Sequence, residues 1–279
     1  MFKKILSTAL AMAMVLSMAV STSAALGKPG SSTPSTKTEQ SSSSSKKSSS
    51  SSSSSKGHDL CKTQLAKDKL ALSMHNTFLS GLKANKDKIT VSIKGYTEKQ
   101  VYAAFQSSLQ MIFDEHPEIF WLDTMQNLVV SSDHKTLTFY PRPASGYGTA
   151  SKDGLTASKL NTTAIKNTTA KMNEAVKKMT GSTTYEQVKA IHDGIINKTQ
   201  YPANPDKATH NQHQAVGPLV EGKAVCDGYA KAFKYACDQK GIPCVIVVGN
   251  ATNNIGEKGT HAWNYVQVDG KWYQVDTDW

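Results

Sequence analysis

The chain has 279 residues and a formal net charge of +10, from 32 lysines and arginines against 22 acidic residues. Arg142 is the single arginine, so almost all of the positive charge is lysine. Nucleic-acid-binding proteins favour clustered arginine interleaved with aromatic residues, and the composition therefore argues against a nucleic acid as the partner. A diffuse positive field suits anionic polymers, such as those of a cell wall, or acidic proteins.

The first 25 residues have the features of a secretory signal peptide. Lys3 and Lys4 precede a mostly apolar run over residues 5–20, and small residues follow up to Ala25. The run is short for a membrane span, and cleavage is expected after Ala24 or Ala25. The sequence thus predicts export from a bacterial cell, with no stable membrane span once the signal is removed.

Residues 26–57 are predicted to be a disordered serine-rich linker. Thirteen serines and two lysines fill residues 41–55. Such a composition offers almost no apolar surface to bury, so the segment is expected to stay solvated. Two interpretations remain open for it. It is either a spacer that holds the protein away from a wall or surface, or an extension with no attachment.

Residues 58–150 are predicted to form a small α+β region. Helical periodicity runs over residues 65–82, and Thr97-Glu-Lys-Gln100 is a capping box that starts a second helix, which ends before Pro117. Aromatic residues in this region are expected to form core rather than a ligand site. Three short strands are expected, at residues 118–122, 127–130 and 136–140.

Residues 155–279 are predicted to form a second domain, after a Gly/Pro/Ser-rich linker at residues 143–154. Helices are expected at residues 155–179 and 185–199. A loop containing His210 and His213 follows. Zinc would need further ligands, so we expect no metal there. We expect the loop to line a cleft opposite Cys226 instead.

Cys226 stands where this loop changes to a helical pattern that Gly241 ends. A thiol at a helix N-terminus faces unpaired backbone N–H groups and the positive end of the helix dipole, and both favour the nucleophilic thiolate. The alternative is a buried structural cysteine. If the thiol is catalytic, its own backbone N–H, helped by a group of the preceding loop, would form an oxyanion hole.

The other cysteines are Cys61, Cys237 and Cys244. Cys237 lies at the end of the Cys226 helix, and Cys244 lies at the start of the strand expected after it. A disulfide across that turn is geometrically possible and would persist outside a cell. Two buried thiols are the alternative, and we favour the thiols. Cys61 lies beside the serine-rich linker.

The last strands place a histidine beside a carboxylate. Residues 242–249 form a β-branched run, and Asp269-Gly270 separates two further alternating runs, the strongest short signal for a hairpin with a type I′ turn. That turn puts Val268 opposite Lys271, so Asp276 lies opposite Trp263. His261 is then a diagonal neighbour of Asp276 on the same face, roughly 7 Å away at the backbone.

Cys226, His261 and Asp276 therefore have the order and facing of a Cys-His-Asp nucleophile system. Cys226 would attack, His261 would act as base and acid, and Asp276 would fix the tautomer of His261. Trp263 and Trp272 lie on the same face of the hairpin. They would either shield the cleft or form sheet core, and core is the interpretation we favour.

Four blocks in this order resemble the bacterial transglutaminase-like superfamily: Lys-Ala-Val-Cys-Asp-Gly-Tyr-Ala from Lys223, Gly-Ile-Pro-Cys-Val-Ile-Val-Val-Gly from Gly241, His-Ala-Trp-Asn from His261, and Trp-Tyr-Gln-Val-Asp from Trp272. The resemblance covers about a third of the chain, from Thr184 onward. It implies an α+β fold with a papain-like core, in which the cysteine-bearing helix packs on an antiparallel sheet. It also implies that the three residues named above form the catalytic triad.

The resemblance implies an exported cysteine-dependent enzyme that transfers acyl groups from amide bonds through a thioester. The outcome is either protein cross-linking or amide hydrolysis, with protein or peptide substrates that include wall-associated ones. No cofactor is expected, and no calcium-binding loop of the EF-hand type is present. The alternative is a non-catalytic surface-binding module that retains the fold. Family members usually continue beyond the position of Trp279, so we expect either a truncated domain or a sheet that lacks an edge strand.

Overall fold

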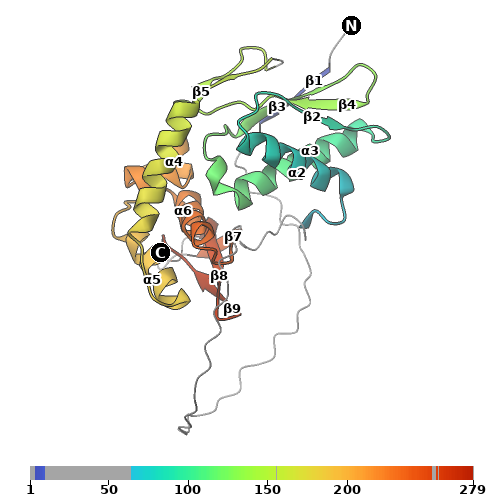
Figure 1. The fold of residues 1–279 in the computed structure, drawn as a ribbon. Helices are drawn as coiled ribbons and strands as arrows, with labels where there is room; N and C mark the ends of the chain where they lie inside the picture. The colour runs from blue at the N-terminus through green and yellow to red at the C-terminus, as the bar shows by residue number, and fades with distance from the viewer. Residues whose placement is uncertain (1–3, 10–63, 155, 253–255, 257, 279) are drawn as a thin grey trace, which may run out of the picture. The chain divides into compact units, whose positions relative to one another are not determined.

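The computed structural model describes residues 4–9, 64–154, 156–252, 256 and 258–278 (Figure 1). The predicted serine-rich linker and Cys61 lie outside the described residues. So does the predicted signal peptide, apart from β1 (Lys4–Ala9), which pairs antiparallel with β3 (Met125–Val130). In the described part of the chain, no helix has the length and apolar character needed to cross a membrane.

The first region combines two helices with a four-stranded antiparallel sheet. The helices α2 (Lys69–Lys83) and α3 (Glu98–Glu115) pack together, and the sheet has the order β1-β3-β4-β2, with β2 at Ile89–Ser92 and β4 at Thr136–Phe139. The capping box of Thr97 and Gln100 is formed as predicted. Phe78, Phe105 and Phe139 meet at this helix–sheet interface, with ring centroids 4.9–5.7 Å apart.

Two predictions for this region are wrong. The predicted strand at residues 118–122 begins instead as the 3₁₀ helix η1 (Pro117–Ile119), because Pro117 fixes the backbone for a helical turn and the following aromatic residues turn into the core. Ile89–Ser92, which was not predicted, forms β2, and its alternation of buried and exposed residues matches a one-sided strand.

The predicted linker at residues 143–154 contains β5 (Gly148–Thr149), which pairs with β6 (Lys159–Leu160). The helix expected from residue 155 starts later, as α4 (Thr162–Lys177), because the Asn161 side chain accepts a hydrogen bond from the Ala164 N–H and caps it.

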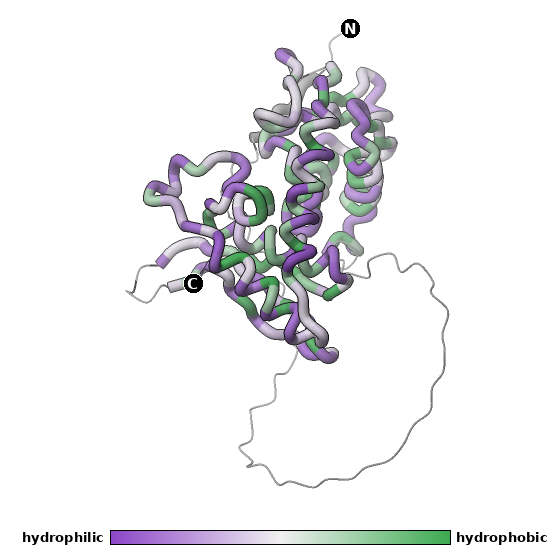
Figure 2. The backbone as a smooth tube through the Cα atoms, turned by 60° about the vertical axis from the view of Figure 1, so that its left-hand side comes forward, coloured by the Kyte–Doolittle hydropathy of each residue, from purple (hydrophilic) through white to green (hydrophobic). Residues whose placement is uncertain are grey.

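The remaining elements surround one buried helix. They are α5 (Thr184–Ile196), η2 (Pro205–Lys207), η3 (His210–His213), the π-helix η4 (Gly217–Glu221), α6 (Cys226–Gln239), β7 (Cys244–Thr252), β8 (Lys258–Val268) and β9 (Lys271–Val275). Every residue of α6 from Cys226 to Cys237 is buried. Along the helices other than α6, hydrophilic and hydrophobic residues alternate, as they do in amphipathic helices (Figure 2).

A buried lysine ties α6 to the first region. Lys234 Nζ lies 3.4 Å from Glu115 of α3, 3.3 Å from Asp238 and 3.0 Å from the Cys244 carbonyl oxygen. The side chains of Lys234 and Glu115 are each 3% exposed. One connected hydrophobic core also runs from Leu65 to Val268, across the boundary expected near residue 150.

The three-stranded antiparallel sheet β7-β8-β9 covers α6, and its hairpin has the predicted register. Val268 pairs with Lys271, and Asn264 pairs with Val275. Asp269 and Gly270 both have positive φ, at 50° and 77°, as a type I′ turn requires. Asn264 Nδ2 donates to the Ala230 carbonyl oxygen at 3.1 Å and joins the sheet to the helix.

Candidate active site

Cys226 is the first residue of α6 and is 8% exposed. The preceding N-cap, Val225, has no side-chain hydrogen-bonding group, so it leaves the orphan N–H groups of the first turn uncapped. The Val225 N–H itself donates to the Gln212 carbonyl oxygen at 3.1 Å. The sulfur therefore lies at the positive end of the dipole of a buried helix.

The carboxylate of Asp276 lies directly against His261. The distance from His261 Nε2 to Asp276 Oδ2 is 2.7 Å, with the two side chains 4% and 21% exposed. The other carboxylate oxygen accepts the Asp278 N–H at 3.0 Å. Because Nε2 is engaged, Nδ1 is the nitrogen left for the hydrogen bond between His261 and Cys226. The structure thus brings together the three residues that the sequence singled out; their catalytic role stays a prediction.

The electrostatics of this group favour a charged imidazole. Burial opposes protonation of His261, but the hydrogen bonds and negative charges of Asp276 and Cys226 outweigh burial and raise the pKa of His261 to about 9. An imidazole that remains protonated beside the sulfur stabilises a thiolate. The same group can then give its proton to a leaving amine.

Trp263 lies flat beside the imidazole. The two ring centroids are 5.9 Å apart and the planes differ by 22°. Gly249, which pairs with His261 across β7 and β8, makes room, because a Cβ there would lie 2.9 Å from the Trp263 ring. Trp272, for which we favoured a core position, is 40% exposed. The preference for core is therefore wrong for Trp272, which lies beside the hairpin turn, opposite Gln267.

The loop with the two histidines packs against the first turn of α6. His213 Nδ1 lies 2.9 Å from Asp227 Oδ1, and Lys231 Nζ donates to the His213 carbonyl oxygen at 2.8 Å. The Gln212 carbonyl oxygen approaches Gly228 so closely that a Cβ there would be 2.1 Å away. The role of the loop is thus to hold the first turn of α6. The sequence showed the glycine but not the contact that requires it.

His210 of the same loop contacts the first region, where its Nε2 lies 2.7 Å from the Phe120 carbonyl oxygen. His210 and His213 therefore bond to different groups. Across the parts of the chain that the structure describes, no three histidine, cysteine or acidic side chains are grouped as they would be around a metal ion.

Cys237 and Cys244 are both free thiols with no exposed surface. The Cys244 thiol donates to the Val245 carbonyl oxygen at 3.9 Å. Burial, reinforced by the neighbouring Cys244, raises the pKa of Cys237 well above its ordinary value. The structure therefore has the two buried thiols of the favoured alternative, and not the disulfide.

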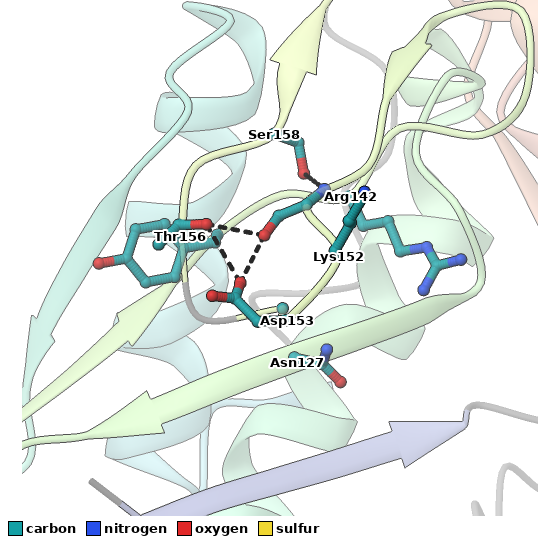
Figure 3. A pocket seen from close by; sticks show the side chains of 9 residues that line it. Asn127, Arg142, Lys152, Asp153, Thr156 and Ser158 are labelled. Atoms are coloured by element: carbon teal, nitrogen blue, oxygen red, sulfur yellow. Dashed lines mark hydrogen bonds between the residues drawn. The ribbon is translucent and has the colours of Figure 1, made fainter.

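A separate polar pocket of about 90 Å³ lies beside the β5–β6 hairpin (Figure 3). Ser151 Oγ donates to Asp153 at 2.6 Å, and the Ser151 N–H donates to Ser158 at 3.2 Å. These groups satisfy one another and so stabilise the loop itself. The residues that line this pocket include none of Cys226, His261 and Asp276.

Residues 172–277 match the model of the transglutaminase-like superfamily. They contain all three residues of the candidate site. Within these residues the helices and the antiparallel sheet, with α6 packed on β7-β8-β9, form a transglutaminase-like α+β fold that is consistent with a papain-like core.

Two curated relatives are the kyphoscoliosis peptidases of Mus musculus, 34% identical over 104 residues, and of Homo sapiens, 33% identical over 107 residues. These matches cover 34% and 35% of this chain but only 15% and 16% of the relatives. A crystal structure of a TGase is similar at 18% identity and a TM-score of 0.35, over 55% of this chain and 43% of that one. A putative cysteine protease from Cytophaga hutchinsonii is similar at 19% identity and a TM-score of 0.34, over 55% and 56%.

Proposed function

We propose that this protein is an exported cysteine-dependent enzyme that transfers acyl groups from amide bonds through a thioester on Cys226. The observation that carries the proposal is the hydrogen-bonded chain Asp276–His261–Cys226 at the N-terminus of α6. A nucleophile, a base within reach of it and a carboxylate that orients the base are the three parts that such chemistry needs.

In the first half-reaction the Cys226 thiolate attacks the amide carbonyl carbon. The negative charge that develops on the carbonyl oxygen faces the uncapped N–H groups at the start of α6. The C–N bond then breaks, and the proton held by His261 goes to the leaving amine. In the second half-reaction a primary amine or water attacks the thioester, gives its proton to His261 and releases the Cys226 sulfur. An amine yields a new amide, and water yields a carboxylic acid.

Proteins or peptides are the proposed substrates. The matched relatives carry the name peptidase, and the family model matches residues 172–277, which hold the candidate triad. The structure has His261 on a strand and Cys226 on a helix that is buried on all sides, which gives the rigid support that a positioned nucleophile requires.

Trapping of the thioester tests the proposal. The protein would be mixed with p-nitrophenyl acetate at pH 7 and quenched in acid, and the peptide that contains Cys226 would be weighed by mass spectrometry. We expect acetylation of Cys226 within seconds, and its loss when hydroxylamine is added. His261→Ala should acylate at least 100-fold more slowly. Equal acylation rates in both proteins would contradict the proposal and favour the non-catalytic binding module.

We also propose that the protein is exported and acts outside the cell, in association with the wall. The amino-terminal pattern of Lys3, Lys4 and the apolar run supports this. Cleavage after Ala24 or Ala25 would remove β1 and leave β3 as an edge of its sheet. Mass spectrometry of protein recovered from culture medium and from a high-salt wash of cells should find a chain that begins at Ala25 or Leu26. Protein retained in the cell with residue 1 intact would contradict export.

A further inference from the structure

The indole ring of Trp263 has no role in the chemistry proposed above, although it lies beside the proposed base. Trp263 follows His261 by two residues on β8, so both side chains leave the same face of the strand. The two rings are stacked, with centroids 5.9 Å apart and planes that differ by 22°. Asp276 bonds to the edge of the imidazole through Nε2, and a hydrogen bond at the edge leaves the faces of the ring for other contacts.

Ordinary packing does not explain why the indole lies where it does. The Nε1 atom of Trp263 is buried and has no hydrogen-bond partner in the part of the chain that the structure describes. A buried tryptophan N–H usually finds an acceptor, and leaving it unpaired costs free energy. The ring therefore holds this place despite an unmade hydrogen bond, and the stack with His261 is a contact that can offset the loss.

Gly249, on the neighbouring strand β7, leaves the space that the indole fills. Gly249 pairs with His261, and a Cβ at Gly249 would lie 2.9 Å from the Trp263 ring. Its φ lies outside the left-handed region, so the backbone there would accept a residue with a side chain. A glycine inside a strand weakens it, and close approach by another group is a usual reason for one. The missing side chain at Gly249 thus serves the stack and not a turn.

We propose that Trp263 is a positioning residue for His261, whose indole, admitted by Gly249, holds the imidazole in the orientation that reaches Cys226 and stabilises its protonated form. An aromatic ring attracts a cation that lies within about 6 Å of its centroid. A stacked neighbour also restricts rotation of the imidazole out of its plane, which hydrogen bonds at the ring edge do not. This inference rests on the proposed function, since it concerns how the proposed base is held.

The titration of His261 in the protein without substrate is the first test. Asp276, Asp278 and the Cys226 sulfur are the groups whose charges act on His261. A neutral replacement of Trp263 leaves all of these charges in place. In Trp263→Leu, the pKa of His261 followed by NMR should fall by about 0.5, as expected for the loss of a contact between a cation and an aromatic ring. Trp263→Phe keeps an aromatic face and should restore about half of this fall.

Tryptophan fluorescence gives a second reading of the same contact, because a protonated imidazole quenches an indole stacked on it more strongly than a neutral one does. The difference between the emission of the wild type and of Trp263→Phe isolates Trp263 from the other tryptophans. This difference should grow as the pH rises through about 9, where His261 loses its proton, and it should not change with pH in a His261→Gln background. A difference that stays constant in the wild type would contradict the stack.

Gly249→Ala tests the stack without altering either ring. The new methyl group should displace the indole, lower the pKa of His261 as Trp263→Leu does, and slow acylation of Cys226 by p-nitrophenyl acetate about tenfold. In a Trp263→Leu background the same change should slow acylation less than twofold, because the ring that the methyl group meets is gone. The control is Gly259→Ala on β8, whose Cβ meets nothing within 4 Å and which should leave both quantities unchanged.

A pKa of His261 that is the same in the wild type, Trp263→Leu and Gly249→Ala would overturn the proposal. So would a Gly249→Ala effect on acylation that is equally large with and without Trp263. A lower melting temperature with an unmoved His261 titration would mean that Trp263 only supports the fold. These outcomes are separate from a failure of the proposed function, in which Cys226 of the wild type forms no thioester while the His261 titration still responds to Trp263.

Discussion

Replacement of Asp276 by asparagine would measure how strongly the carboxylate holds His261 in its charged form. The bond between them is 2.7 Å long, and the contacts of His261 raise its pKa from 6.5 to about 9 although burial acts in the opposite direction. That difference corresponds to about 3 kcal/mol. Asp276 contributes more than Cys226, so we assign about 2 kcal/mol to the carboxylate, a factor of about thirty in the protonation equilibrium of His261.

The assay is an NMR titration of the His261 ring between pH 5 and pH 10, with the resonance assigned by its loss in His261→Gln. Asp276→Asn should lower the pKa of His261 by more than one, and it should slow acylation of Cys226 at pH 7 by a factor of about 30 or more, because less thiolate is held beside the imidazolium. Asp269→Asn is the matched control and should leave both quantities unchanged. A His261 titration in Asp276→Asn that overlays the wild-type curve would refute this account of the site.

Three further predictions concern the scaffold and its response to pH. Lys234→Met leaves Glu115 unpaired in the core and should lower the free energy of unfolding in urea by about 3 kcal/mol, whereas Lys171→Met on the exposed face of α4 should change it by less than about 0.5 kcal/mol. Gly228→Ala should lower the urea midpoint of unfolding despite the better helix propensity of alanine, because the new Cβ meets the Gln212 carbonyl oxygen. The control is Gly259→Ala, whose Cβ meets nothing within 4 Å and which should not lower the midpoint. Equal midpoints for the two variants would contradict the packing described for η3. The stability that His261 contributes should be complete below its ordinary pKa of 6.5 and lost as the pH rises through about 9. The free energy of unfolding of the wild type should therefore fall more than that of His261→Gln between pH 6.5 and pH 9. Plots of this free energy against pH that run parallel for the two proteins would count against the raised pKa.

The parts of the site that local patterns determine could be predicted from the sequence. Asp269 and Gly270 specify a two-residue turn, and a two-residue turn fixes which residues lie opposite each other on β8 and β9. His261 and Asp276 follow from that register alone. Cys226 could be placed at a helix start because the apolar spacing begins there and Gly241 ends it with a positive φ of 68°.

Contacts between distant segments could not be predicted in this way. No local pattern shows that Lys234 meets Glu115, 119 positions earlier in the chain, or that the carbonyl oxygen of Gln212 lies against Gly228. The strand expected at residues 118–122 failed for a related reason: its apolar composition suits a buried strand, but Pro117 and the core contacts of Phe120 favour a helical turn.

The central claim is that Cys226 and His261 form one activated pair, and the alkylation rate of Cys226 by iodoacetamide as a function of pH tests it most directly. The rate would be measured for the Cys226 peptide between pH 5 and pH 9, in the wild type and in His261→Ala. The account predicts fast labelling of the wild type below pH 7 that is lost in His261→Ala. Labelling of both proteins along the same curve, with the midpoint of an ordinary thiol near 8.5, would contradict it.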